Sequence, residues 1–189
     1  ACAAARALGY SEIITYSFVS PTVFDNIRLP KDTPLRNAIR IINPLGEDTS
    51  IMRTVILPSM LDILARNHAY KNKGVKLYEM GRIYLPVEGR DLPDEPKRLI
   101  FGTYGEHEDF FSMKGEIDAL LAALNIPAAT YVRSSDDPSY HPGRCAELRT
   151  ASGRRAEGQR KQPEAHHPCT QKRQVFPLHF GPSLRNVSC

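Results

Sequence analysis

Two groups of residues toward the C-terminal end of this 189-residue chain have side chains that could bind a ligand. His166, His167 and Cys169 offer the nitrogen and sulfur atoms that hold zinc in proteins. We predict no metal site there, because no fourth ligand follows at a suitable spacing. His141 and Arg144 could position an anionic ligand, but a His-Pro-Gly-Arg sequence is more typical of an ordinary turn.

Glu79 and Arg82 form another pair of opposite charges that could have a function. They lie three residues apart in a stretch whose sequence predicts a strand. Their side chains would therefore point to opposite faces of the sheet and could not pair with each other. No glycine-rich phosphate loop occurs in the chain, and strands do not alternate regularly with helices. These observations argue against a Rossmann or P-loop nucleotide site.

The composition is that of a soluble globular protein, with 41% hydrophobic and 24% charged residues. No apolar run approaches the roughly 18 residues that a membrane-spanning helix needs, and no secretory signal opens the chain. The four cysteines form no Cys-x-x-Cys pair and match no zinc or redox signature. We therefore expect a cytoplasmic protein with reduced thiols and no membrane partner.

Charge is distributed unevenly along the chain. Residues 1–152 carry 18 basic against 19 acidic side chains, whereas residues 153–189 carry 7 against 2. The first region therefore offers no charge-based reason to predict a nucleic-acid surface. Residues 153–169 also lack apolar periodicity. We predict one domain at 1–152, followed by a basic segment at 153–189 that is irregular or foreign to the domain.

The expected elements follow from apolar spacing and from residues that cap helices. Glu12–Val19 is rich in β-branched and aromatic residues, which favours a strand. Pro58 and Asp109 suit the first turns of the two longest helices. The connection at 86–96 carries three prolines and should be exposed. In chain order, we expect helices at 2–8, 20–28, 57–73 and 109–124, and strands at 12–19, 38–42, 75–85, 99–104, 130–134 and 145–150.

The order of these elements predicts the fold class. Strands joined by short connections, with helices inserted between them, indicate an α+β fold with a mainly antiparallel sheet flanked by helices. The chain begins with Ala1 inside a predicted helix rather than with an initiator methionine. We therefore expect a piece of a longer protein.

Five stretches of the chain, in this order, resemble the β chain of bacterial phenylalanyl-tRNA synthetase. They are Leu8–Val19, Asn43–Pro58, Lys76–Tyr84, Asp109–Glu116 and His141–Arg144. Each stretch alone is weakly specific, whereas five collinear matches between residues 8 and 144 are specific. The resemblance ends near residue 150, where the family would continue with another strand and a glycine-rich stretch.

The resemblance implies a class II aminoacyl-tRNA synthetase-like domain within an α₂β₂ enzyme. In that family a catalytic α chain packs against a related, catalytic-like β domain. The whole enzyme joins phenylalanine to tRNA-Phe in the cytoplasm and uses ATP and Mg²⁺. The family's β-chain magnesium ligands, editing site and tRNA-binding terminal module would lie outside this chain, so we expect no cofactor site within it.

The stretch that resembles the second class II motif lacks the arginine of that motif. Adenylate formation needs cationic groups fixed against a phosphate. Alignment on Phe-Arg-x-Glu places Leu77 at the arginine position, and alignment on the α chain's Gly-Arg-Val-Tyr-Arg pattern places Leu85 there. A leucine donates no hydrogen bond to a phosphate. No third-motif Gly-x-Gly-x-x-x-Arg sequence occurs either, so we predict no catalytic residue.

The helix predicted at 57–73 is where we expect contact with the α chain. We assign Arg53, Pro58, Asp62, Arg66 and Tyr70 to the subunit interface, because the resemblance is densest around them. The alternative is that this helix serves the core of its own domain alone. An apolar stripe at helical spacing is more often core than partner surface.

Two other functions remain open at this point. A stand-alone class II-like protein could bind ATP through a different arginine, for which Arg82 and Arg98 are the best candidates. An RNA-binding module could act through the basic residues of 153–189 by contact with phosphates, although no aromatic platform accompanies them. Exposed partner surface also leads us to expect self-association of the isolated chain.

Overall fold

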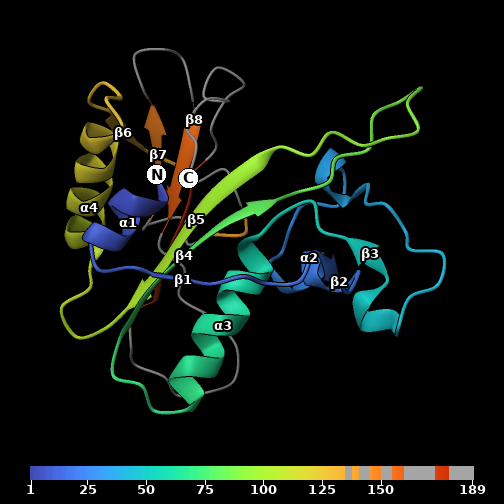
Figure 1. Cartoon of the computed structure of the whole chain (residues 1–189), viewed down its shortest axis with the longest axis horizontal. Coiled ribbons are helices and arrows are strands. Elements are labelled where there is room, and N and C mark those ends of the chain that lie inside the picture. The colour runs from blue at the N-terminus through green and yellow to red at the C-terminus, as the bar shows by residue number, and fades with distance from the viewer. Residues whose placement is uncertain (135–137, 141–144, 150–154, 160–172, 179–189) are drawn as a thin grey trace.

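The computed structural model describes residues 1–134, 138–140, 145–149, 155–159 and 173–178, and Figure 1 shows their arrangement. The helices are α1 (Cys2–Ala7), α2 (Val23–Asn26), α3 (Leu57–Ala69) and α4 (Phe110–Ala123). Short 3-10 helices occur at Pro34–Arg36 and Glu47–Thr49. The strands are β1 (Ser11–Glu12), β2 (Phe18–Val19), β3 (Ile51–Met52), β4 (Val75–Arg82), β5 (Lys97–Tyr104), β6 (Thr130–Arg133), β7 (Cys145–Arg149), β8 (Arg155–Gln159) and β9 (Arg173–Leu178).

One large sheet organises the molecule. Within the described residues it has seven strands in the order β1-β4-β5-β9-β8-β7-β6, and β2 pairs with β3 separately. β1 runs parallel to β4, and the other neighbours in the large sheet are antiparallel. Helix α3 lies on one side of the sheet, and α1 and α4 lie on the other (Figure 1). The expected α+β fold with a mainly antiparallel, helix-flanked sheet is confirmed.

Helix α3 packs closely against one face of the sheet. Leu77 of β4 and Ile100 of β5 belong to an apolar cluster that includes Met60 and Leu64 of α3. Both helix residues have no exposed surface, as their positions in the predicted apolar stripe imply. Gly102 allows this close approach, because a Cβ at that position would lie 2.6 Å from the Sδ of Met60.

Helices α1 and α4 cover the opposite face of the sheet with a second apolar cluster. Tyr78, Leu99 and Phe101 alternate along β4 and β5 with the residues beneath α3, and all three are buried. They share the cluster with Met113 and Ile117 of α4. Strands β4 and β5 therefore have apolar residues on both faces, and helices of the same chain cover both.

The ends of the two long helices test the capping predictions. The Asp109 side chain accepts hydrogen bonds from the N–H groups of Phe111 and Ser112, at 2.8 and 2.9 Å, and the Asp109 N–H donates to the Ser112 hydroxyl. The predicted N-cap of α4 is thus confirmed. Helix α3 ends at Ala69 rather than at residue 73. Lys71, with a φ of +65°, adopts the left-handed conformation that stops it.

The strand predicted at 12–19 is wrong as a single element. The structure divides it into β1 and β2, which belong to different sheets. Between them, the Thr15 hydroxyl donates to the Glu79 carboxylate at 2.8 Å instead of the backbone continuing the ladder with β4. A specific side-chain contact therefore overrides a local preference for strand.

Two further short predictions are wrong in extent. The helix predicted at 20–28 is limited to α2, and Arg28 follows it with a left-handed φ of +54°. The strand predicted at 38–42 is reduced to an isolated bridge between Arg40 and Ile51. Both stretches are short, so tertiary contacts outweigh their local propensities.

The prediction of an irregular segment at 153–189 needs correction. Strands β8 and β9 lie within it, and β9 pairs with both β5 and β8. Without β9, the β5 backbone would be left with unpaired N–H and C=O groups on that side, which favours a strand there although Pro177 interrupts the apolar run. Residues 160–172 and 179–189 lie outside the described residues, and the domain boundary at 152 stays a prediction.

Truncation of a side chain that is buried between α3 and the sheet should destabilise the domain strongly. We expect Leu64→Ala to lower the free energy of unfolding by about 2–5 kcal/mol, because Leu64 is fully buried. Leu92→Ala is the matched control, since Leu92 is 75% exposed, and it should change stability little. Urea unfolding followed by circular dichroism measures both. Equal effects of the two substitutions would contradict the packing described for α3.

Candidate functional site

The two leucines that stand at the arginine positions of the second class II motif are both part of the core. Leu77 is only 8% exposed and lies in the cluster beneath α3. Leu85 is half-buried, packs against the same cluster and pairs with Asp94 through an isolated bridge. Neither alignment therefore brings a cationic side chain to this part of the sheet.

A buried ion pair lies next to Leu77. The Nη1 atom of Arg53 is 2.9 Å from the Oε1 atom of Glu79, and both side chains are 3% exposed. Arg53 also donates through Nε to the Arg82 carbonyl at 2.9 Å and through Nη1 to the Thr15 hydroxyl at 2.8 Å. Thr15 in turn donates to the second carboxylate oxygen of Glu79. The two buried charges therefore have several polar partners, which offset the loss of hydration.

This network leaves little capacity for ligand chemistry. The Glu79 carboxylate and the Arg53 guanidinium neutralise each other inside the chain, so neither presents a free charge to a substrate. The prediction that Glu79 does not pair with Arg82 is confirmed, because Arg82 lies 3.4 Å from Glu95 in an exposed ion pair. Sequence reasoning missed the true partner of Glu79, since no spacing rule links Arg53 to the strand that contains Glu79.

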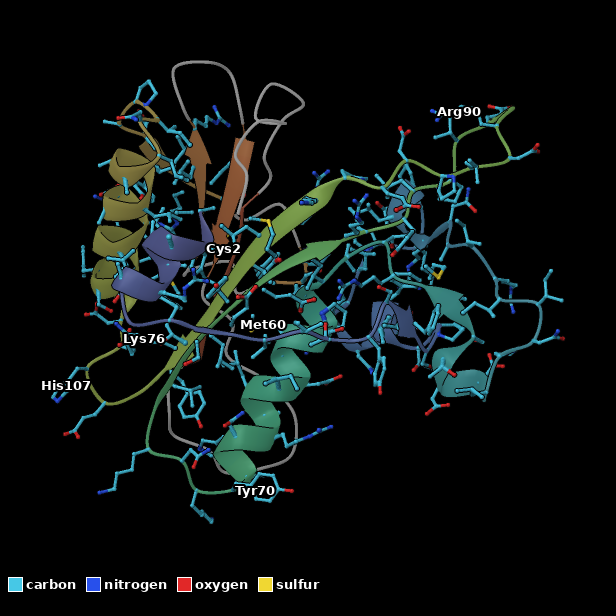
Figure 2. The ribbon with its side chains drawn as sticks, in the orientation of Figure 1. Cys2, Met60, Tyr70, Lys76, Arg90 and His107 are labelled. Atoms are coloured by element: carbon cyan, nitrogen blue, oxygen red, sulfur yellow. The ribbon has the colours of Figure 1, made fainter. Side chains whose placement is uncertain are left out.

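The predicted interface residues fall into two groups. Arg53 and Pro58 are buried, so their side chains are enclosed by this chain and present no surface to a partner. Asp62 and Arg66 are exposed and lie four residues apart on α3, which places them on one side of the helix. Tyr70 follows the helix end, is 76% exposed, and lies at the end of α3 in Figure 2.

A second polar cluster joins the start of α4 to the sheet. Lys76 of β4 lies 3.3 Å from a Glu108 carboxylate oxygen and also forms an ion pair with Glu116. The Tyr10 hydroxyl donates to Glu116, and burial raises the pKa of this phenol. Figure 2 shows Lys76 on the side of the sheet where α4 lies. The groups satisfy one another, so we interpret the cluster as structural.

Arg98 differs from the other arginines of the sheet. Its Nε atom is buried without a hydrogen-bond partner, and burial lowers the pKa of its guanidinium. Its Nη1 atom donates to the carbonyl of Lys97 at 3.3 Å. Among the described residues no ion pair joins it to a carboxylate. Of the two arginines considered for an ATP site, Arg98 is therefore the one with unused donor capacity.

Other candidate ligands give no site that can be described. His141 and Arg144, like His166, His167 and Cys169, lie outside the described residues. Within the described part of the chain, no group of three or more His, Cys, Asp or Glu residues could hold a metal ion. None of the described helices is long and apolar enough to cross a lipid bilayer.

Removal of one charge from the buried pair should be far more damaging than removal of an exposed charge. We expect Glu79→Gln to destabilise the domain by about 3–5 kcal/mol, because it leaves Arg53 buried without a counter-charge. Glu95→Gln breaks the exposed pair with Arg82 and should change stability by less than about 1 kcal/mol. Chemical denaturation compares the two variants. Similar values for both would show that the buried pair is not the stabilising contact that its geometry suggests.

Comparison with known proteins agrees with the resemblance found in the sequence. Residues 2–156 match the family model described as the phenylalanyl tRNA synthetase beta chain CLM domain. The phenylalanine–tRNA ligase beta subunit of Clostridium tetani is 46% identical over 141 residues, which is 74% of this chain and 18% of the relative. That of Clostridium acetobutylicum is 44% identical over 142 residues, 75% of this chain and 18% of the relative.

A solved structure supports the fold. The pyrrolysyl-tRNA synthetase PylSc of Desulfitobacterium hafniense matches with a TM-score of 0.67, covering 94% of this chain and 63% of that chain. At 13% sequence identity, this likeness concerns the fold alone. The chain spans less than a fifth of the length of the two clostridial relatives. The family model and the identities together establish that this chain belongs to the CLM-domain family of phenylalanyl-tRNA synthetase β chains.

Proposed function

We propose that this chain is a non-catalytic, class II synthetase-like scaffold within phenylalanine–tRNA ligase. The whole enzyme would be a cytoplasmic α₂β₂ assembly that joins phenylalanine to tRNA-Phe with ATP and Mg²⁺. The relatives are beta subunits, which supports the existence of a partner subunit. The observation that carries the non-catalytic part of the proposal is the burial of Leu77 in the core, where catalytic relatives would need an arginine.

The helices that cover both faces of the sheet support the same proposal. A nucleotide site needs space against the sheet and fixed positive groups that stabilise the phosphate charge as it grows. Here α3 covers one face of β4 and β5 with apolar residues, and α1 and α4 cover the other. The buried Arg53, which pairs with Glu79 of the same strand as Leu77, is neutralised by that carboxylate. The sheet is thus used for packing.

The outer surface of α3 is our proposed contact with the catalytic α chain. Asp62, Arg66 and Tyr70 are exposed, while the opposite side of the helix is buried in the core. Tyrosine and arginine are enriched among the residues that dominate binding energy in protein interfaces. An exposed aromatic side chain beside exposed charges fits such a surface, so Tyr70 and Arg66 are the best candidates for strong contacts.

An ATP-binding alternative is favoured by one observation, the buried Nε of Arg98 that lacks a hydrogen-bond partner. An oxyanion placed there would supply the missing acceptor. Its weakness is that a single half-buried arginine lacks the second cationic group and the metal that adenylate chemistry uses. The RNA-binding alternative through 153–189 stays a prediction, because the structure does not describe the side chains of that segment.

The isolated chain should not perform the first step of aminoacylation. We expect no ATP–pyrophosphate exchange above background, because the buried Leu77 stands where a phosphate-binding arginine would be needed. Calorimetry with ATP should likewise detect no binding in the micromolar range. A complete enzyme of the family is the positive control. Micromolar ATP binding that is lost in Arg98→Ala would contradict the scaffold proposal and favour the alternative.

Substitutions on the outer surface of α3 should weaken binding to the α chain of the same enzyme. We expect Tyr70→Ser to raise the dissociation constant by about fivefold or more, because it removes an exposed aromatic contact. Phe111→Ser is a matched control, since Phe111 is 75% exposed but lies on α4. Biolayer interferometry with the immobilised α chain measures both. If Phe111→Ser weakens binding and Tyr70→Ser does not, the interface lies over α4.

A further inference from the structure

Helix α4 has an outward side that is apolar although it faces away from the sheet. Four exposed residues follow one another at intervals of three or four positions, so they share that side of the helix. They are Phe111, Gly115, Ala119 and Ala122, and Phe111 is 75% exposed. The other side of α4 is buried against the sheet. A helix that is apolar all round is normally buried, whereas a surface helix has a polar outer side.

The charged residues of α4 do not make its outward side polar, because each of them is paired within this chain. Lys114 lies 2.8 Å from Asp118, and its ammonium group lies over the Tyr131 ring at 4.7 Å from the centroid. Glu116 forms its ion pair with Lys76 of β4. These contacts use all three charges of the helix, so the outward side has little attraction for water.

Gly115 indicates that another backbone approaches this side closely. Glycine within a helix is less stable than alanine, because it loses more conformational freedom on folding. A Cβ at position 115 would meet no described atom within 4 Å, so no contact inside this chain requires glycine there. Gly102 differs, since it makes room for Met60. The missing Cβ of Gly115 therefore suits contact with a segment from outside.

We propose that the polypeptide that precedes α1 in the longer β subunits packs on this side of α4, over Phe111 and Gly115. The matched region is 18% of each clostridial relative, so most of their chain lies outside it. Helix α1 lies on the same face of the sheet as α4 and shares its apolar cluster (Figure 1). A segment that leads into α1 therefore arrives on the side of the sheet where α4 lies.

The small size of the surface favours a tethered occupant over a free one. A phenylalanine buries roughly 150–250 Å², and glycine and alanine add little. A stable interface between separate chains buries about 800 Å² on each partner, which this side of α4 does not offer. A segment that is joined to α1 is held nearby at a high effective concentration, so a small apolar contact is sufficient for it. A second copy or a separate subunit lacks that advantage.

One substitution should have opposite effects in the isolated chain and in the full-length β subunit. Gly115→Ala should raise the thermal midpoint of the isolated chain by about 1–4 °C, because alanine favours the helix and the added methyl group meets nothing. In the full-length β subunit of the same enzyme, that methyl group would push the docked segment away. Hydrogen exchange of the α4 amides should therefore become faster than in the parent subunit.

Two comparisons complete the experiment. In the parent proteins, the α4 amides should exchange roughly tenfold more slowly in the β subunit than in the isolated chain, because the docked segment opposes local opening. Leu92→Ser, at a position that is 75% exposed like Phe111, should change neither the midpoint nor the exchange rates. Amine-reactive cross-linking of the partly exposed Lys114 in the β subunit, mapped by mass spectrometry, should join it to residues that precede Ala1.

Several results would overturn the inference. If α4 exchanges equally fast in the isolated chain and in the β subunit, or if Gly115→Ala slows exchange in both, no segment packs on this side. Protection that appears only after the α chain is added would assign the surface to that chain. Protection of the isolated chain that grows with its concentration would assign it to a second copy. None of these results depends on ATP binding, so the scaffold proposal holds or fails independently.

Discussion

The buried ion pair between Arg53 and Glu79 is the interaction on which the rest of the arrangement depends. Two charges in the interior are tolerated only when each has partners, and here Thr15 and the Arg82 carbonyl supply them. The pair joins three parts of the chain that are distant in sequence, namely the segment after β1, the residues before α3 and strand β4. It therefore sets where α3 begins over the sheet and which way the segment of 13–18 turns.

This constraint connects packing to function. With the pair in place, α3 lies close over Gly102, and the apolar cluster beneath it encloses Leu77. On the other face, α1 and α4 enclose Tyr78 and Phe101. A sheet that is covered in this way by its own chain is suited to packing, and the exposed side of α3 is the surface that we propose for contact with another chain.

Sequence reasoning found the elements whose signals are local and missed those that depend on distant partners. The Asp109 cap and the apolar stripe of α3 are encoded within single helices, so α3 and α4 were predictable, as were β4 and β5. The division of 12–19 depends on Glu79, more than sixty positions away. Pro177 interrupts the apolar run of β9, so the stretch was expected to be irregular, but it pairs with β5 in the structure. At the candidate site, alignment on the family's second motif identified Leu77 and Leu85, whereas the ion pair between Arg53 and Glu79 could be recognised only in the structure.

An experimental structure of this chain bound to the α chain, in the presence of a non-hydrolysable ATP analogue, tests the central claim most directly. We expect nucleotide density against the α chain alone, with Leu77 still enclosed beneath α3. Triphosphate density gripped by guanidinium groups of this chain, such as those of Arg82 or Arg98, would contradict it.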